Sequence, residues 1–331
     1  MIIVSKSFTT LETTMNAKAI LAWLQESGCN QSQIADALYA VTANPPAAAA
    51  FGVSENNVYP FWDWVGGRYS VWSAVGLPIA LQYGFETFRE FLAGAEAMDL
   101  HFKNAPLEDN LPVIMALALL HQQKTHGIHS YAAIPYADAL DWFPKWLQQL
   151  DMESNGKSVD RDGKPVEFSS PVVFGSAGSN AQHSYFQMLH QGTEIIPIDF
   201  IAVREPMSDR PEAVAHHRIL LSNCLAQAQA LAKGKVASDP NDVYPGQRPS
   251  NLLLLPKLNA FYLGALLALY ENRAASLGAL WNINSFDQPG VEYGKVLAKP
   301  IEKALASDAN DIVASEHIDA VTAARINFLN S

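Results

Sequence analysis

The stretch VVFGSAGSNAQH, residues 172–183, decides the fold class, because a strand, a glycine turn and the start of a helix follow one another within it. Val172–Gly175 is β-branched and aromatic, and the polar residues after it open a helical pattern. Five further apolar runs are expected to be strands: Ile2–Val4, Ala132–Pro135, Ile195–Phe200, Leu252–Leu255 and Ala279–Ile283. Amphipathic stretches alternate with them, around Leu11–Ser27, Pro112–Gln122, Gln182–Gln191, Glu212–Lys235, Asn259–Asn272 and Gly290–Ala306. This alternation predicts an α/β fold with mostly parallel sheet covered by helices on both faces.

In such a fold, ligands bind at the carboxyl ends of strands, where the glycine-rich turn after Gly175 is expected to lie. The turn lacks the GxGxxG spacing and the following acidic residue of a dinucleotide site, so that interpretation is rejected. His183 follows on the first helical turn, close to where a ligand would sit. A histidine held there for structural reasons is an equally good interpretation.

Composition limits the class of protein. The 331 residues are 49% hydrophobic and 17% charged, which is typical of a globular chain, and the net charge is 22 − 33 = −11. This charge, without a long basic run, argues against a nucleic-acid partner. Cys29 and Cys224 alone give neither a disulfide framework nor zinc-ligand spacing. The apolar start is too short for a signal peptide and Val113–Leu120 is too short for a membrane span, so a cytoplasmic protein without membrane contact is expected.

The opening turn, SKSFTT at residues 5–10, has the composition of an anion site. Thr9 and Glu12 match a capping box, which predicts a helix that begins near Thr9. Free N–H groups at such a helix start favour an anion, and the neighbouring hydroxyls and lysine add donors. The alternative is an ordinary helix cap with a solvated lysine.

Three more segments carry candidate groups. In DWVGGRYS, residues 63–70, two glycines permit a tight turn and a close ligand before Arg68. In MESNGK, Glu153 is expected in a turn after a helix that ends near Gln149, where it could act as a general base. In SFDQPGVEYGK, residues 285–295, a helix begins at Pro289-Gly290 and carries Lys295. Each segment alone is equally well explained by solvated side chains.

Together, in this order, SKSFTTLET, DWVGGRYSVWSAVG, MESNGK, GSNAQHSYFQMLHQGT and SFDQPGVEYGK resemble the phosphoglucose isomerase family, along essentially all 331 residues. The resemblance implies a sugar-isomerase (SIS) type three-layer αβα sandwich. It also implies an enzyme that interconverts glucose 6-phosphate and fructose 6-phosphate through a cis-enediolate. A hexose 6-phosphate substrate, a homodimer, and no metal or organic cofactor are further implications.

The family's functional residues map onto individual positions. The resemblance implies that Glu153 shuttles the proton between C2 and C1 and that Arg68 faces the enediolate. It assigns ring opening to His183, supplied by the neighbouring subunit, and Lys295. The residues implied in substrate binding are Ser5, Lys6, Ser7, Thr10, Gln149 and Gln288. Departures from the family pattern, none of which removes a catalytic group, are Ser7, Ser179, Ala181 and Pro289.

The family also carries a long N-terminal portion with a Gly-Ile-Gly-Gly-Ser phosphate loop that this sequence lacks. Residues 1–85 are therefore expected to be the C-terminal remnant of a first SIS domain, 86–306 a complete second SIS domain, and 307–331 a helical tail. Ile2–Val4 is expected to lack sheet partners, and phosphate binding to be weakened. Two functions stay open: an isomerase, weakly active or inactive as this chain alone, or a non-catalytic protein that binds sugar phosphates. The retained Glu153 favours the first, and the missing loop favours the second.

Overall fold

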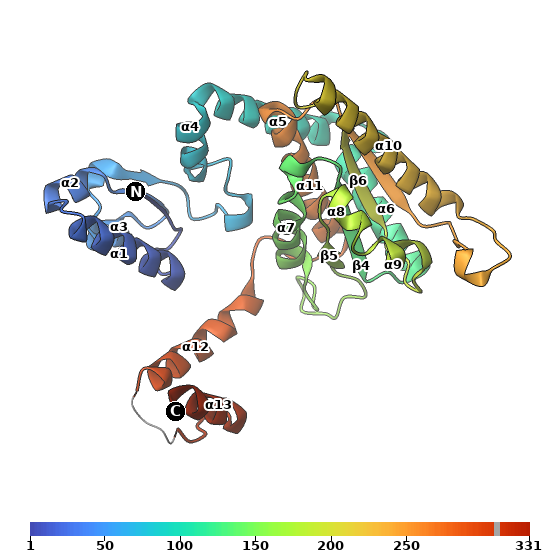
Figure 1. The fold of residues 1–331 in the computed structure, drawn as a ribbon. Coiled ribbons are helices and arrows are strands. Elements are labelled where there is room, and N and C mark those ends of the chain that lie inside the picture. Colours follow the sequence, from blue (N-terminus) through green and yellow to red (C-terminus); the bar gives the residue numbers. More distant parts are fainter. Residues whose placement is uncertain (308–311) are drawn as a thin grey trace. The chain divides into compact units, whose positions relative to one another are not determined.

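A computed structural model describes residues 1–307 and 312–331 (Figure 1). The chain divides into two compact units, Met1–Ser285 and Phe286–Ser331. Among the described helices, none has both the length and the apolar character needed to cross a membrane.

The first sheet has three parallel strands in the order β1-β2-β3. Its strands are β1 (Ile2–Val4), β2 (Tyr39–Thr42) and β3 (Val58–Pro60), and its helices are α1 (Leu11–Glu26), α2 (Gln31–Asp36) and α3 (Pro45–Phe51). The expectation that Ile2–Val4 lacks partners is wrong, because Ile3 pairs with Ala40 of β2. The core of this part joins Ile3, Ala40 and Ala48 of α3.

β2, β3 and α3 were not predicted from the sequence. The strands have only four and three residues, too few to show alternation of side chains, and they contain Ala40 and Pro60, which are depleted in strands, unlike the equally short run Ile2–Val4. The run of prolines and alanines in α3 forms a helix for two reasons. The side chain of Asn44 accepts a hydrogen bond from Ala47 N at 3.3 Å, and the two prolines occupy the first helical positions.

The second sheet has four parallel strands in the order β5-β4-β6-β7. The strands are β4 (Ser130–Pro135), β5 (Val172–Phe174), β6 (Ile198–Val203) and β7 (Ser250–Leu255). The larger helices of this part are α4 (Leu77–Tyr83), α5 (Phe85–Asn104), α6 (Leu111–His126), α7 (Phe143–Gln148), α8 (Gly178–Gln182), α9 (Phe186–Gln191), α10 (Pro211–Lys233) and α11 (Ala260–Leu280). The predicted α/β class with parallel sheets is confirmed.

Helices cover both faces of this sheet, as alternate side chains require (Figure 1). Ala133 and Ile201 point into a core shared with α6, α7 and α11. Ile134 and Phe200 point into a second core, shared with α9 and α10. The predicted strand Ala279–Ile283 is wrong, because this apolar run is the end of α11 and the turn after it.

α5 and α11 cross closely because glycines face the crossing on both helices. A Cβ at Gly94 would lie 1.8 Å from the carbonyl oxygen of Phe261, and one at Gly264 would lie 2.0 Å from that of Phe91. Any side chain at either position would therefore push the helices apart. The crossing fixes α11, which carries residues that support the candidate site.

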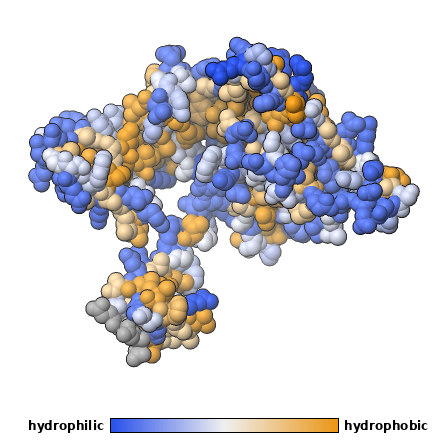
Figure 2. All heavy atoms as spheres, in the orientation of Figure 1, coloured by the Kyte–Doolittle hydropathy of each residue, from blue (hydrophilic) through white to orange (hydrophobic). Residues whose placement is uncertain are grey.

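The second unit contains a short turn at Pro289–Val291, α12 (Glu292–Leu305) and α13 (Ala320–Asn330). α12 agrees with the predicted helix Gly290–Ala306, and α13 lies in the predicted helical tail 307–331, of which residues 308–311 fall outside the described part. Ala304, Ile318, Ala323 and Ile326 form its small core. Hydrophobic side chains reach the surface of the molecule at several places (Figure 2).

Candidate active site

Glu153 lies in a π-helical turn, Gln149–Glu153, that continues directly from α7. The prediction that the helix ends near Gln149 and leaves Glu153 in a turn is therefore wrong. A π turn is wider than an α turn and occurs mostly at functional sites, because it redirects side chains. Here it turns Asp151 into the protein interior and leaves Glu153 partly exposed, with 23% of its side chain accessible.

A buried ionic network anchors this turn to the sheet. Asp151 pairs with Arg273 of α11. Nη1 of Arg273 donates to Tyr131 Oη at 2.8 Å and lies 3.6 Å from Oδ2 of Asp199. Tyr270 donates to Asp199 at 2.7 Å. All these groups are at most 2% exposed. Because removing one partner from a buried pair leaves the other charge uncompensated, the network ties the π turn to α11 and to the two central strands.

Burial governs the protonation of this network. It raises the pKa of Asp151 to about 6, although Arg273 opposes the shift. It also raises the pKa values of Tyr131 and Tyr270 well above their usual range, so both hydroxyls stay protonated as hydrogen-bond donors. The network holds a fixed set of donors and acceptors under Glu153.

The segment after Glu153 is also fixed. Asn155 Nδ2 donates to the carbonyl oxygen of Ala274 at 2.8 Å, and its Oδ1 accepts from Ser285 Oγ at 2.6 Å. Both Asn155 and Ser285 are buried. These bonds join the segment after the π turn to α11 and to the loop that follows α11.

Arg68 is a buried arginine beside this segment. Its Nε donates to Ser154 Oγ at 2.7 Å and its Nη2 donates to the carbonyl oxygen of Ser285 at 2.7 Å. Its Nη1 lies 3.6 Å from Oε2 of Glu153. The planar guanidinium is held by its other donors, so its position does not depend on the ion pair.

The two glycines before Arg68 do not use the backbone freedom that was expected to explain them. Gly66 has φ −77°, and Gly67 is not among the glycines with positive φ. A Cβ at Gly67 would meet no heavy atom within 4 Å. Backbone strain therefore gives no reason for these glycines, and open space next to Arg68 is the feature that the structure shows.

Glu153 is oriented by two neighbours on the same oxygen. Gln149 Nε2 donates to Oε2 at 2.9 Å, and Arg68 faces the same atom. No hydrogen bond from the described residues reaches Oε1 of Glu153. A carboxylate held in this way presents one unoccupied oxygen next to a fixed cation, an arrangement suited to taking a proton from a carbon beside a developing oxyanion.

The opening turn differs from its expected capping. α1 begins at Leu11 with Thr10 as its N-cap, and no side chain caps it, so the predicted Thr9–Glu12 capping box is wrong. Thr9 instead shares a hydrogen bond with Ser7 Oγ at 2.6 Å. The uncapped first-turn N–H groups remain available to an anion.

Hydrogen bonds give this turn a defined shape. Ser5 Oγ accepts from the backbone N–H of Phe8, whose φ of 57° is unusual for a residue other than glycine. Thr42 Oγ1 donates to the carbonyl oxygen of Lys6 at 3.0 Å, which fastens the turn to β2. The exposed side chains that could meet an anion are those of Lys6, Ser7 and Thr10.

The other predicted residues belong to other elements. His183 is exposed at the end of α8. Lys295 belongs to the second unit, where it forms an exposed pair with Glu292 at 2.8 Å, and Gln288 precedes the short turn of the same unit. Of the predicted set, Arg68, Gln149 and Glu153 are joined by direct contacts within the first unit. Within the described ranges, no three His, Cys, Asp or Glu side chains are grouped as a metal ion would need.

Sequence reasoning missed the supporting residues Asp151, Ser154, Arg273 and Ser285. Ser154 and Ser285 lie inside the motifs that were singled out, but a serine gives no sign of its partner. Arg273 in the apolar stretch of α11 was a usable signal, because a buried arginine requires a buried acid.

Comparisons with known proteins show what this chain is similar to. The family model for phosphoglucose isomerase matches residues 1–326. A glucose-6-phosphate isomerase of Cupriavidus metallidurans is 48% identical over 98% of this chain and 61% of its own length. One of Polaromonas naphthalenivorans is 52% identical over 92% of this chain and 58% of its own length. The chain thus spans about three-fifths of the length of these curated relatives.

Two solved structures are also similar to this chain. A glucose-6-phosphate isomerase from Chlamydia trachomatis matches with a TM-score of 0.81 and 37% identity, over 92% of this chain and 59% of that one. A hypothetical protein, TT0462 from Thermus thermophilus, matches with a TM-score of 0.75 and 28% identity, over 92% of this chain and 71% of that one.

Proposed function

The chain belongs to the phosphoglucose isomerase family, and from this premise we propose that it interconverts glucose 6-phosphate and fructose 6-phosphate. The observation that carries the proposal is the contact of Glu153 with both Gln149 and Arg68. Glu153 and Arg68 are 85 positions apart in the sequence, and the fold brings them into contact, while Oε1 of Glu153 has no hydrogen bond from the described residues.

The reaction moves one proton between neighbouring carbons. Glu153 takes the proton from C2 of the open-chain aldose while the carbonyl oxygen at C1 becomes an enediolate oxyanion. The proton of the C2 hydroxyl moves to that oxygen, and Glu153 returns its proton to C1, which gives the ketose with its carbonyl at C2. Arg68 lies where this negative charge develops, so it stabilises the transition state more than the neutral substrate. General base catalysis of this kind contributes about 10²–10⁴-fold in rate.

The remaining predicted residues act around this pair. We infer that the opening turn binds the phosphate with Ser5, Lys6, Ser7 and Thr10, supported by the uncapped start of α1. The exposed position of His183 supports its donation to the site of a second copy in a homodimer, where it would open the sugar ring together with Lys295. Gln288 would line the same site.

Three further statements belong to this proposal. The protein works in the cytoplasm. The three-stranded sheet and its helices, within residues 1–85, belong to a first SIS domain. The four-stranded sheet lies in a second SIS domain, residues 86–306, followed by a helical tail.

The alternative is a protein that binds sugar phosphates without converting them. The intact contact between Glu153 and Arg68 favours the isomerase, because binding alone needs no base.

A coupled assay with fructose 6-phosphate separates the two functions. Glu153→Gln keeps the shape of the side chain and removes the base. Glu205→Gln makes the same chemical change in an exposed pair with Arg204 and is the matched control. Turnover by the unaltered chain and the control, with a loss of at least about 10²-fold in Glu153→Gln, is expected. Equal, background-level turnover in all three proteins would refute the isomerase and favour the binding protein.

A further inference from the structure

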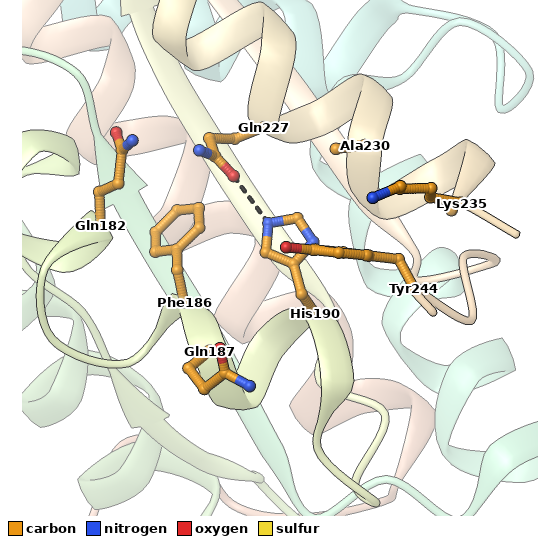
Figure 3. A pocket seen from close by; sticks show the side chains of 9 residues that line it. Gln182, Phe186, Gln187, His190, Gln227, Ala230, Lys235 and Tyr244 are labelled. Atoms are coloured by element: carbon orange, nitrogen blue, oxygen red, sulfur yellow. Dashed lines mark hydrogen bonds between the residues drawn. The ribbon is translucent and has the colours of Figure 1, made fainter. Parts of the chain in front are cut away.

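A cavity of about 470 Å³ lies between α8, α9, the end of α10 and the loop after it, and its lining includes none of the residues that contact Glu153 (Figure 3). Its volume is in the range of small-molecule sites. Figure 3 shows Gln182 and Phe186 on one side of His190, and Lys235 and Tyr244 on the other. The catalytic proposal uses none of these side chains.

His190 sets the polarity of the cavity. It is 91% buried, and its Nε2 lies 2.7 Å from Oε1 of Gln227. Because an amide oxygen only accepts, Nε2 carries the proton and donates to it. Gln227 therefore uses its oxygen on the histidine and keeps both amide hydrogens for another partner. No hydrogen bond from the described residues reaches Nδ1 of His190.

The other lining groups are mainly donors. Lys235 is the one charged side chain in the lining, and neither Asp nor Glu is among the lining residues. The amide of Gln182 and the hydroxyl of Tyr244 have no hydrogen-bond partner among the described residues. In a chain with a net charge of −11, this cavity is a local site with a positive charge and several donors.

The outer wall of the cavity is preformed. Lys235 and Tyr244 exchange two backbone hydrogen bonds of 2.9 Å, which place their side chains next to each other. Gly234 and Gly246 both have positive φ and approach so closely that a Cβ on either would lie 2.7 Å from the other's backbone nitrogen. Gln191 Nε2 holds the loop from inside, with bonds of 2.9 and 2.8 Å to the carbonyl oxygens of Asn241 and Val243. Such a wall is fixed before any ligand arrives, which lowers the entropic cost of binding.

We propose that this cavity is a second ligand site, which binds a small metabolite through an anionic oxygen group, either phosphate or carboxylate. Lys235 and the amide hydrogens of Gln227 hold the oxygens, next to the buried ring of His190. Phe186 and Tyr244 cover the apolar part of the ligand.

The cavity also adjoins the segment that carries His183. Gln182, a lining residue, directly precedes His183 in the chain, and α9 begins three residues after it. A ligand that fixes Gln182 therefore restricts His183. This consequence rests on the proposed function, whereas the binding itself does not.

Histidine ¹⁵N spectra of the full chain test the binding directly. Inorganic phosphate and succinate are titrated separately, and His190 is assigned from the signal lost in His190→Asn. A saturable shift of the His190 signals with either probe is expected, and the probe that acts identifies phosphate, carboxylate or both as the recognised group. Absence of a saturable shift with both probes would overturn the proposal.

Two variants and a control make the test specific. Lys235→Met should weaken binding by about 10- to 100-fold, as expected for one charge-assisted hydrogen bond. Gln227→Glu should abolish binding of either probe, because a negatively charged carboxylate replaces the amide that donates to the ligand. Lys233→Met, an exposed lysine at the end of α10 outside the lining, should bind as the unaltered chain does. Equal binding by Lys235→Met, whose exposed side chain is not needed for folding, would also overturn the proposal.

The same spectra test the link to His183. Filling the cavity should shift the His183 signal in the unaltered chain, and Lys235→Met should lose this shift in parallel with that of His190. A shift of His190 alone would leave the ligand site established and refute its effect on His183. Since no turnover is measured, failure of this proposal is distinct from failure of the isomerase proposal.

Discussion

Replacing Arg68 by lysine keeps the positive charge and removes the geometry that holds it. The guanidinium donates at 2.7 Å to Ser154 Oγ and at 2.7 Å to the carbonyl oxygen of Ser285, from different nitrogens. A lysine has one nitrogen and cannot reach both acceptors in this arrangement. At least one charge-assisted bond is lost, so Arg68→Lys should lower the free energy of unfolding by about 1.5–3 kcal/mol.

Catalysis should fall as well, because the lysine nitrogen is no longer fixed opposite Glu153. Loss of one positioned group that stabilises an oxyanion typically lowers kcat by about 10²–10³-fold. Urea unfolding followed by circular dichroism gives the stability change, and the coupled assay gives kcat. The matched control is Arg204→Lys, since Arg204 is 73% exposed in a surface pair and the same change should cost less than about 0.5 kcal/mol. A stability loss at Arg68 no larger than that at Arg204 would refute the buried contacts from which the argument starts.

Three further predictions concern buried groups and assembly. Burial raises the pKa of Glu271 from 4.5 to about 8, so the contribution of its protonated form to stability is complete below pH 4.5 and is lost as the pH rises through 8. Between pH 5 and pH 9, the free energy of unfolding of Glu271→Gln should therefore rise by about 1–3 kcal/mol relative to that of the unaltered chain, after allowance for the partial exposure of Glu271. Parallel pH profiles of the two proteins in urea unfolding would contradict this. Ser154→Ala removes a buried acceptor of Arg68 and should destabilise by about 1–3 kcal/mol in the same assay, whereas an unchanged urea midpoint would speak against it. Mixing inactive His183→Gln and Glu153→Gln chains should restore about a quarter of the turnover, because half of randomly formed dimers would hold one intact site; no recovery after subunit exchange would contradict donation of His183 across a dimer.

Much of the fold could be predicted because its strands are short apolar runs between helical patterns. β4 to β7 were found in this way, with shifts of up to three residues at their ends. β2 and β3 were missed although β1 and β5 are as short, because they contain Ala40 and Pro60, residue types that are depleted in strands, whereas β1 and β5 consist of β-branched and aromatic residues. Ala279–Ile283 was misassigned because the end of α11 is apolar on every side, and such a run cannot be told from a buried strand by periodicity.

The site was less predictable from the residues themselves. No spacing indicates that Arg68 meets Glu153, and their association was expected only from the family resemblance. The π turn depends on tertiary contacts, chiefly the pairing of Asp151 with Arg273, which lies 122 positions away. Local sequence cannot encode such a pairing, and so the helix was predicted to stop where the π turn begins.

Deuterium exchange tests most directly whether Glu153 moves a proton between two carbons of the substrate. Because 23% of the Glu153 side chain is accessible, a proton resting on the carboxylate should exchange with solvent. In D₂O, the unaltered chain should place deuterium at C1 of fructose 6-phosphate and at C2 of glucose 6-phosphate, as read by ¹H NMR, and Glu153→Gln should place almost none. Equal incorporation by the two proteins, or none by either, would contradict the account.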